Sequence, residues 1–271
     1  MNKQIIGFIG TGNMAESMIR GLTTIEFNSR VLWATDIDEA RLAYIAENYD
    51  VVSKSLETIA KEADVIILAV KPQSIELVLT NLADHIRQDK QLIISIAAGV
   101  TTSEIERHCG TTLSLVRCMP NTPAMIGFGA TGLFANKRVS INQRQEADSI
   151  LKTLGINAWV DNEDKIDIIT AISGSGPAYF FLFIEALQDI SIELGLDDNL
   201  SKKLVNQTAM GAAHLAQTQI DDIAGLRQKV TSPGGTTEAA IKVFESGGFK
   251  KLVKEAALAA HKRSVNIAKN K

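Results

Sequence analysis

Two glycine-rich turns hold the residues best suited to chemistry. One spans Thr231–Thr237, reads Thr-Ser-Pro-Gly-Gly-Thr-Thr, and leads into a helical pattern at Glu238–Phe244. Backbone N–H groups at the start of a helix have no partner within the helix and carry the positive end of its dipole, so they bind small anions such as a carboxylate. We therefore expect an acid-binding turn in the C-terminal half of the chain.

The other turn, Gly10–Ala15, has the pattern G-x-G-x-x-A between a strand-like run and a helical pattern. Its first glycine allows a tight turn, its second lets a pyrophosphate approach the backbone, and the small Ala15 lets helix and strand pack closely. Asp36 ends the next strand-like run, where an acidic residue accepts hydrogen bonds from the adenosine ribose and repels a 2′-phosphate. A structural turn with a surface aspartate is the competing interpretation. The two turns together predict a two-substrate enzyme that uses a dinucleotide.

The composition limits the class of partner. The chain has 271 residues, of which 45% are hydrophobic, so it can bury at least one full core and is expected to divide into two domains. Its 28 Lys and Arg against 31 Asp and Glu give a net charge of −3. This charge offers no general attraction to nucleic acid or to acidic membranes, so we expect a small-molecule partner, no nucleic acid and no membrane.

Neither a leader peptide nor a metal site is expected. Residues 1–4 run directly into the strand-like Ile5–Ile9 without the pattern of a signal peptide, which predicts a cytoplasmic location. Cys109 and Cys118 lack Cys-x-x-Cys spacing and are expected to be reduced core residues. The four histidines lack the spacing of a zinc site, so no metal is expected.

The pattern of hydrophobic residues changes near residue 160. Before it, short β-branched runs alternate with amphipathic stretches, which predicts a doubly wound parallel α/β sheet, the Rossmann arrangement. After Asp164 the strand pattern disappears and long Ala/Leu/Ile-rich periodic runs predict an all-helical region. Ala178–Ile184 is apolar around most of its circumference, so its burial requires another helical layer, which a second copy of the chain can supply. The expected strands are Ile5–Ile9, Val31–Thr35, Val65–Val70, Leu92–Ile96, Leu113–Cys118 and Ala158–Val160, and the expected helices are Met14–Leu22, Ala40–Glu47, Ser55–Glu62, Ser74–His85, Gln143–Leu154, Asp164–Ile172, Ala178–Leu194, Asn199–Gln217 and Phe249–Ala268.

Three further positions are candidates for the site. Lys71 follows a strand at the carboxyl edge of the predicted sheet, where ligands bind, although a lysine there is often only solvent-exposed. Asn121 lies in a loop between two prolines and either binds the nicotinamide carboxamide or satisfies its own turn. Ser173–Pro177 marks a helix start whose glycines allow a ligand to approach the backbone, and plain helix capping is the alternative.

Five motifs in a fixed order carry a family resemblance: Gly7–Ala15, Ala69–Pro72, Arg117–Pro123, Ser173–Tyr179 and Ser232–Thr237. Over essentially its whole length the chain resembles the pyrroline-5-carboxylate reductase family. The resemblance implies hydride transfer from a reduced nicotinamide to the C=N bond of 1-pyrroline-5-carboxylate, giving L-proline in the last step of proline synthesis. It also implies an interlocked helical dimer, in some members built into larger rings. Residues 1–162 are then expected to form the dinucleotide-binding Rossmann domain, and residues 163–271 an all-helical substrate-binding and dimerisation domain.

The expected chemistry is positioning rather than covalent catalysis, because the cofactor supplies the hydride and a protonated imine is already a good acceptor. Thr237 is the first candidate to hydrogen-bond the imine nitrogen, with the amides of Gly235 and Thr236 holding the carboxylate; helix capping by Thr236 or Thr237 is the alternative. The expected catalytic residues are Thr237 and Lys71. The expected substrate-binding residues are Asn121, Ser173, Val230, Ser232, Gly234, Gly235 and Thr236. The expected cofactor-binding residues are Gly10, Thr11, Gly12, Asn13, Met14, Thr35, Asp36, Ser55, Ala69, Val70, Lys71, Pro72, Ala97 and Ala98.

The family usually prefers NADPH, and many members carry Ser, Asn or Arg after the second strand to bind the 2′-phosphate. Here Asp36 and Asp38 stand in that segment, so NADP or NAD in the reduced form is expected, with NADH used at least comparably. The family also often has a Glu just upstream of the acid-binding turn. Asp221 and Asp222 are the nearest acids here, and their role in proton transfer is left open.

Two other functions compete. A 3-hydroxyacid dehydrogenase or a broader imine reductase shares the layout, but the hydroxyacid enzymes place a catalytic lysine on the first long helix of the second domain, and Ile184–Ile190 has none. A non-catalytic dinucleotide-binding regulator is expected to lose the Ser232–Thr237 turn, which is intact.

Overall fold

The computed structural model describes residues 3–24, 30–88, 90–218 and 222–269. The chain forms two compact units, one of Met1–Ser175 with Ala260–Lys271 and the other of Gly176–Ala259. The expected boundary between residues 162 and 163 separates a dinucleotide-binding domain from a substrate-binding domain, whereas these two units are separated by their internal contacts. The expected boundary stays a prediction.

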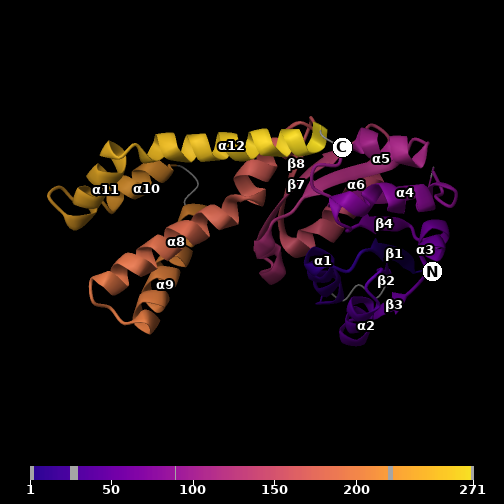
Figure 1. Cartoon of the computed structure of the whole chain (residues 1–271), viewed down its shortest axis with the longest axis horizontal. Coiled ribbons are helices and arrows are strands. Elements are labelled where there is room, and N and C mark those ends of the chain that lie inside the picture. The colour runs from indigo at the N-terminus through magenta and orange to yellow at the C-terminus, as the bar shows by residue number, and fades with distance from the viewer. Residues whose placement is uncertain (1–2, 25–29, 89, 219–221, 270–271) are drawn as a thin grey trace. The chain divides into compact units, whose positions relative to one another are not determined.

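Eight strands of the first unit form one sheet, in the order β3-β2-β1-β4-β5-β6-β7-β8 (Figure 1). All neighbours are parallel except β6 and β7, so the last two strands run opposite to the other six. The order reverses at β1, which has β2 on one side and β4 on the other; ligands of open α/β sheets bind at such a switch point. The strands are β1 Gln4–Ile9, β2 Arg30–Thr35, β3 Val51–Ser53, β4 Val65–Leu68, β5 Leu92–Ser95, β6 Ser114–Met119, β7 Gly129–Ala135 and β8 Gly155–Val160.

Helices cover both faces of this sheet, which confirms the predicted doubly wound fold. The apolar runs of β1 and β4 are buried on both sides, because alternate side chains enter two separate hydrophobic clusters. Phe8 and Ile67 belong to the cluster under α1 and α6, whereas Ile9 and Ile66 belong to the cluster under α3, α4 and α5. The helices of this part are α1 Asn13–Thr24, α2 Glu39–Asn48, α3 Leu56–Glu62, α4 Ile75–Ala83, α5 Thr102–Cys109, α6 Ile141–Leu151 and α7 Lys165–Ile169, with 3₁₀ turns η1 Pro72–Ser74, η2 Thr122–Ile126 and η3 Lys152–Leu154.

Four strands and α-helices do not appear among the expected ones: β3, β7, α5 and α10, which spans Ile223–Lys229. β3 has only three residues. β7 contains Gly129 and Gly132, which weaken a strand pattern. The start of α5 could have been predicted, because Thr101 and Glu104 form a capping box.

Both cysteines are free and buried, and burial raises the pKa of the Cys109 thiol to about 11, so neither is a ready nucleophile.

Among the described residues, everything after β8 is helix or connection. α7 continues through a π-helical turn, η4 Thr170–Gly174, into α8, which begins at Gly176 and places Pro177 in its first turn as expected. The second unit contains α8 Gly176–Glu193, α9 Asp198–Thr218, α10 Ile223–Lys229, α11 Thr236–Ser246 and the first part of α12 Phe249–Lys269.

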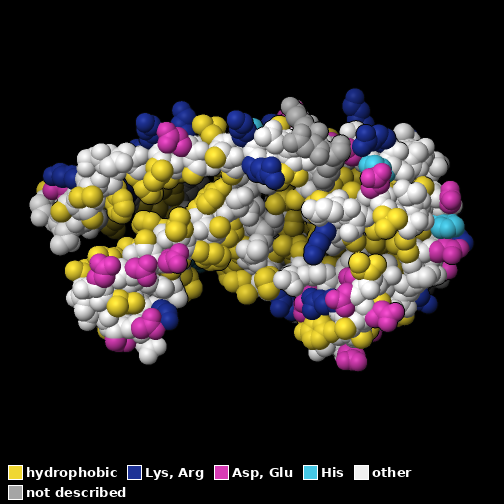
Figure 2. Space-filling model, viewed as in Figure 1, with side chains coloured by type: hydrophobic (Ala, Val, Ile, Leu, Met, Phe, Trp, Pro, Cys, Tyr) yellow, Lys and Arg dark blue, Asp and Glu magenta, His cyan; other side chains and the backbone are white. Residues whose placement is uncertain are grey.

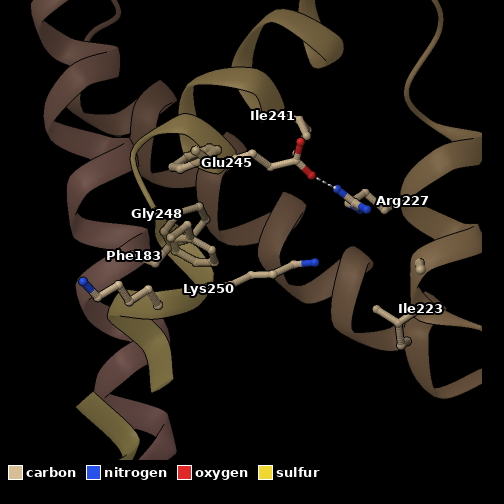
Figure 3. Close-up of a pocket in the computed structure, with 11 residues that line it drawn as sticks. Phe183, Ile223, Arg227, Ile241, Glu245, Gly248 and Lys250 are labelled. Atoms are coloured by element: carbon tan, nitrogen blue, oxygen red, sulfur yellow. Dashed lines mark hydrogen bonds and ion pairs between the residues drawn. The ribbon is translucent and has the colours of Figure 1, made fainter. Parts of the chain in front are cut away.

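The helices of the second unit expose many apolar side chains, which Figure 2 shows in yellow. Phe180 is 72% exposed and Leu182 67% exposed. An apolar pocket of about 730 Å³ opens among α8, α10, α11 and α12, with the ion pair of Arg227 and Glu245 (2.8 Å) at its side (Figure 3). The continuous helix Lys165–Glu193 is long and apolar enough to cross a membrane by length and composition alone, and 22% of its most apolar window is buried.

Candidate active site

The turn after β1 has two glycines that are needed for different reasons. Gly10 has φ +94°, and a Cβ there would lie 2.7 Å from the carbonyl oxygen of Ala69, so only glycine fits against the end of β4. A Cβ on Gly12 would meet no protein atom within 4 Å. The open space above Gly12 is where a ligand can approach the backbone at the start of α1, so the turn fits a dinucleotide pyrophosphate.

Asp36 lies beside this turn and is held by it. The backbone N–H and the hydroxyl of Thr11 both donate to Asp36 Oδ2, at 2.6 and 2.7 Å, and Asp38 N–H donates to Oδ1 at 3.0 Å. Burial alone would raise the pKa of Asp36, but hydrogen bonds from Asp38, Thr11 and Ile37 outweigh it and hold that pKa below its ordinary value. The carboxylate is therefore ionised and placed where an adenosine ribose binds in this fold.

Sequence reasoning missed Arg41, which contacts the same turn. Its Nε donates to the carbonyl oxygen of Thr11 at 2.8 Å, and its guanidinium forms an ion pair with Glu16 on α1. Arg41 is one charged residue on an amphipathic helix, and no sequence pattern indicates that its side chain turns back toward β1.

Most of the other expected cofactor residues follow the carboxyl ends of β3, β4 and β5. Ser55 caps α3, with its hydroxyl accepting from Thr58 N–H at 3.1 Å. Lys71 is exposed where β4 leads into η1. Ala97 is buried and Ala98 exposed in the loop after β5. The remaining expected members of this set are Asn13 and Met14 at the start of α1, Thr35 at the end of β2, and Ala69, Val70 and Pro72 after β4.

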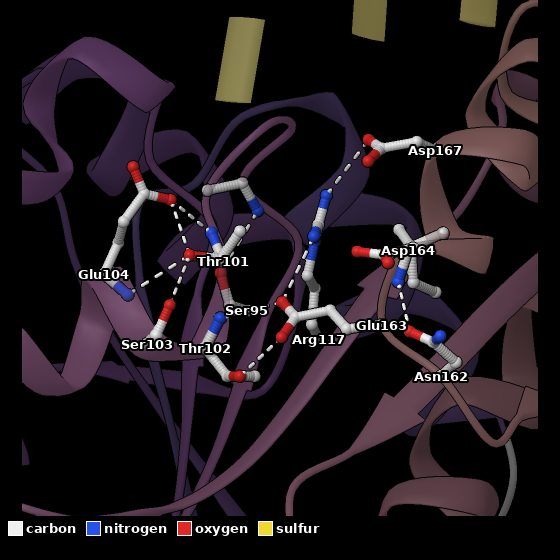
Figure 4. A network of polar contacts seen from close by, with 12 residues as sticks. Ser95, Thr101, Thr102, Ser103, Glu104, Arg117, Asn162, Glu163, Asp164 and Asp167 are labelled. Atoms are coloured by element: carbon white, nitrogen blue, oxygen red, sulfur yellow. Dashed lines mark hydrogen bonds and ion pairs between the residues drawn. The ribbon is translucent and has the colours of Figure 1, made fainter. Parts of the chain in front are cut away.

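A buried ionic network fixes the loop after β5 (Figure 4). Arg117 on β6 pairs with Glu163 at 3.1 Å and with Asp167 at 3.6 Å. Glu163 also accepts from the backbone N–H and hydroxyl of Thr102, at 2.8 and 2.6 Å, and Ser264 near the end of α12 donates to Asp167 at 2.7 Å. In the sequence Arg117 stands out only as part of the Arg117–Pro123 motif. Its partners could not be predicted, because residues far apart in sequence give no sign of pairing.

Asn121 uses its side-chain amide within the chain. Its Nδ2 donates to the carbonyl oxygen of Ser173 at 3.0 Å, and its Oδ1 accepts from Ala130 N–H at 2.9 Å. Asn121 is only 9% exposed. The Ser173 hydroxyl bonds back to the carbonyl of Ile169 at 3.2 Å. Asn121 and Ser173 are therefore in direct contact, and this contact joins the loop after β6 to the π-helical turn. The expected roles of both residues in substrate binding stay predictions.

The predicted acid-binding turn leads into α11 and lies within the second unit. Gly234 has φ +68°, and Gly235 is the N-cap of α11 without any side-chain capping bond, so neither Thr236 nor Thr237 caps the helix. The N–H of Gly235 donates to the carbonyl of Ser232 at 3.0 Å, so this amide already has a partner within the turn, and its expected contact with a carboxylate stays a prediction. The first-turn amides of α11, beginning at Thr236, are the ones that remain for an anion.

The groups around this turn differ in whether they have hydrogen-bond partners. The N–H of Gly234 donates to Glu238 Oε2 at 2.8 Å, so the helix's own acid closes one side of the turn. Within the described part of the chain the Thr237 hydroxyl has no hydrogen-bond partner, whereas the Thr231 hydroxyl donates to Arg227 O at 2.6 Å. Val230 and Ser232 are exposed. Asp222 caps α10 by accepting from Ala224 N–H at 2.9 Å, and Asp221 lies outside the described residues.

No group of three His, Cys, Asp or Glu side chains gathers like metal ligands in the ranges that the structure describes.

The charged side chains beside the Gly10–Gly12 turn, Asp36 and Arg41, both contact Thr11. The first unit thus offers an anion-accepting loop with a fixed carboxylate, and the second unit offers an uncapped helix start with a free hydroxyl.

Comparison with known proteins identifies close relatives. Residues 163–267 match the family model described as pyrroline-5-carboxylate reductase dimerisation, and residues 5–99 match the model described as NADP oxidoreductase coenzyme F420-dependent. A pyrroline-5-carboxylate reductase from Pseudomonas aeruginosa is 45% identical over 99% of this chain and 98% of its own length. The structure of a pyrroline-5-carboxylate reductase from Coxiella burnetii matches with a TM-score of 0.93 and 43% identity over 98% of this chain and 99% of that one. The NADP-bound pyrroline carboxylate reductase from Plasmodium falciparum matches with a TM-score of 0.84 and 30% identity over 99% of each chain.

Proposed function

We infer that this chain, which belongs to the pyrroline-5-carboxylate reductase family, reduces 1-pyrroline-5-carboxylate to L-proline by hydride transfer from NAD(P)H. The observation that carries this function is identity of 45% to a reductase of that name along 99% of the chain. The dinucleotide turn at Gly10–Gly12 and the uncapped start of α11 supply the two anion-binding features that the reaction needs.

We propose that the dinucleotide binds on the Rossmann domain, residues 1–162. The amides at the start of α1 would hold the pyrophosphate above Gly12, and Asp36 would accept hydrogen bonds from the ribose. The reduced nicotinamide, when bound, supplies the hydride. Lys71 would reach a phosphate or the substrate from the end of β4. Asn121, whose amide is already occupied by Ser173 and Ala130, would act by positioning the Ser173 backbone.

We propose that residues 163–271 hold the substrate. The amides that begin α11 at Thr236 would bind the carboxylate of the cyclic imine, and the partner-free Thr237 hydroxyl would hydrogen-bond the ring nitrogen. Positioning of this kind supplies a large part of catalysis when the acceptor is already activated.

The chain forms a homo-oligomer, as expected of the dimerisation region that residues 163–267 match. We propose a dimer, with assembly into larger rings, in which the apolar side chains of α8 and α9 lie against a second copy rather than a membrane. A cytoplasmic location belongs to the same proposal.

We propose that NADH is used at least comparably to NADPH, because Asp36 is ionised beside the proposed ribose site and repels a 2′-phosphate. Steady-state kinetics with both cofactors measures this. A kcat/KM for NADPH more than about tenfold above that for NADH, or about 1.4 kcal/mol, would contradict it.

One assay tests the function as a whole. Purified protein is mixed with NADH or NADPH, and the loss of reduced nicotinamide absorbance is followed with and without 1-pyrroline-5-carboxylate. We expect oxidation only with the imine present, with L-proline as the product. A folded protein that binds the dinucleotide but oxidises none of it would instead be the non-catalytic regulator.

A further inference from the structure

Arg41 is a cation fixed beside the ribose carboxylate. It stands in the first turn of α2, where its own N–H bonds to the N-cap Asp38 at 3.0 Å. Its guanidinium lies over the ring of Tyr44, 5.1 Å from the ring centroid, and its side chain is 25% exposed. The arginine is thus held in one place while part of it still faces solvent.

One loop residue joins this cation to the carboxylate. Thr11 donates its N–H and its hydroxyl to Asp36 and accepts from Arg41 Nε at its carbonyl oxygen, at 2.8 Å. Asp36 and Arg41 therefore flank the same turn. Because both side chains contact Thr11, a 2′-phosphate on a ribose bound at Asp36 would come near Arg41 as well.

Arg41 has hydrogen-bonding capacity to spare. Thr11 and Glu16 take two of the five N–H groups of the guanidinium, and no other acceptor for them occurs in the part of the chain that is described. Guanidinium groups bind phosphate with several charge-assisted hydrogen bonds, which are about twice as strong as neutral ones. A 2′-hydroxyl offers no such charge.

We propose that Arg41 recognises the 2′-phosphate of NADPH and so offsets the repulsion from Asp36, which lets one site accept both reduced dinucleotides. This inference rests on the proposed function, because it requires the dinucleotide at the Gly10–Gly12 turn. The residues directly after β2 offer no group that binds a phosphate, because Ile37 is apolar and 97% exposed, and Asp38 is acidic and caps α2. The inference therefore assigns binding of the 2′-phosphate to Arg41.

Glu16 is the competitor for the same cation. Burial alone would raise the pKa of Glu16, but hydrogen bonds from Arg41 and Tyr49 outweigh it and hold that pKa below its ordinary value. The carboxylate therefore neutralises Arg41 when no phosphate is present. Removing the charge of Glu16 frees the guanidinium and should strengthen 2′-phosphate binding.

Calorimetric titration with two small probes isolates the 2′-phosphate from the rest of the cofactor. The probes are 5′-AMP and 2′,5′-ADP, which differ only in that group. The readout is the dissociation constant of 5′-AMP divided by that of 2′,5′-ADP, so weaker binding of the 2′-phosphate lowers the ratio. The proteins are the wild type, Arg41→Gln, Glu16→Gln, Lys54→Gln as the competing cation, and a control, Arg20→Gln. Arg20 carries the same charge on α1 and acts on Glu16 through space. Among the described residues no hydrogen bond joins the Arg20 side chain to Thr11, unlike that of Arg41.

We expect Arg41→Gln to weaken 2′,5′-ADP at least about tenfold relative to 5′-AMP, which corresponds to about 1.4 kcal/mol. Glu16→Gln should strengthen 2′,5′-ADP relative to 5′-AMP by about threefold or more, and Arg20→Gln should change the ratio less than about twofold. Titrations of NADPH and NADH should give the same order. If Arg41→Gln does not fold, the Glu16→Gln result alone decides the matter.

Three outcomes overturn the inference. Equal weakening of both probes by Arg41→Gln would mean that Arg41 only holds the Thr11 carbonyl. A ratio that falls in Lys54→Gln but not in Arg41→Gln would assign the phosphate to Lys54, which lies over Trp33 after β3. Failure of the folded wild type to bind 5′-AMP or NADH would instead contradict the cofactor site of the proposed function, and the inference would fall with it.

Discussion

The two units of the chain bury their apolar residues very differently. The first unit encloses two hydrophobic clusters, one on each face of its sheet. Among the described residues from Gly176 to Ala259, no hydrophobic side chain is buried, and the buried positions there are Gly176 and Ser201. Yet these helices are rich in Phe, Leu and Ile, and Phe180 and Leu182 are more than two-thirds exposed.

This difference separates a self-sufficient fold from one that depends on a second copy. A helix that is apolar around most of its surface is stable in water only when another layer covers it. The chain forms homo-oligomers, and the matching family model for residues 163–267 is one of dimerisation. The dinucleotide turn therefore rests on a core built by one chain, whereas the turn before α11 rests on helices whose burial requires assembly.

The largest expected effect comes from a charge in the second unit. Phe180→Asp would place a carboxylate in the surface that we propose a second copy covers, and an unpaired buried charge costs several kcal/mol. We expect the assembly to dissociate to single chains and reductase activity to disappear. Light scattering after size-exclusion chromatography measures the mass.

The matched control is Ile141→Asp on α6, which is 78% exposed in the first unit and should leave the mass unchanged. The unfolding midpoint of the wild type should also rise with protein concentration, as it does for assemblies. A Phe180→Asp protein with the wild-type mass would break the comparison between the units.

A smaller effect separates the two glycines of the dinucleotide turn. Gly12→Ala adds a Cβ that meets no protein atom, so the free energy of unfolding should stay within about 0.5 kcal/mol of the wild type, while NADH binding weakens at least about tenfold because the Cβ fills the ligand's space. Gly10→Ala should destabilise by about 1–3 kcal/mol, since φ is +94° and the Cβ would lie 2.7 Å from Ala69 O. Urea unfolding and NADH fluorescence titration measure the two quantities. Tight NADH binding by Gly12→Ala would remove this turn from the cofactor site.

Thr237→Ala tests the other turn. Loss of one hydrogen bond to a charged group should lower turnover of the imine roughly ten- to a hundredfold, while NADH binding barely changes. Thr236→Ala is the control, because its backbone amide is kept and its exposed side chain is not assigned a role. Stopped-flow and steady-state kinetics give both numbers. Unaltered kinetics in Thr237→Ala would exclude its hydroxyl from the reaction.

The sequence predicted the framework of the fold better than the directions of its side chains. Runs such as Val65–Leu68 are fixed by burial on both sheet faces, so composition alone indicates a strand. The antiparallel β7 was missed because Gly129 and Gly132 carry no apolar signal. The predicted role of Asn121 stays a prediction, and its contact with the Ser173 carbonyl depends on a π-helical turn that no local pattern indicates.

The same limit applies to the site. Gly10, Gly12 and Asp36 follow a spacing that the phosphate geometry requires, so they can be read from a motif. Arg41 can be recognised only once α2 is folded against the turn, because its link to Thr11 spans 30 positions. The Gly235 amide shows the reverse case, in which a motif predicts a free group and a short turn to Ser232 satisfies it.

The smallest expected effect is the pH dependence of the Asp36 carboxylate, which receives its hydrogen bonds from Thr11 and Asp38 of the same chain. Its folded pKa lies below the ordinary 3.8, so the unfolded state binds protons first as the pH falls. The stability it contributes is therefore complete above about pH 4 and is lost as the pH falls through the lowered folded pKa.

Asp36→Asn should reduce the free energy of unfolding by no more than about 1 kcal/mol at pH 7, since the carboxylate is partly exposed and solvent screens it. The difference from the wild type should shrink as the pH is lowered below 4, and urea unfolding at a series of pH values measures it. Because the hydrogen bonds of Asp36 come from Thr11 and Asp38 of its own chain, we expect the difference not to depend on protein concentration, unlike the loss caused by Phe180→Asp. A difference that stayed constant down to pH 3, or that grew on dilution, would mean that the dinucleotide turn also depends on a second copy.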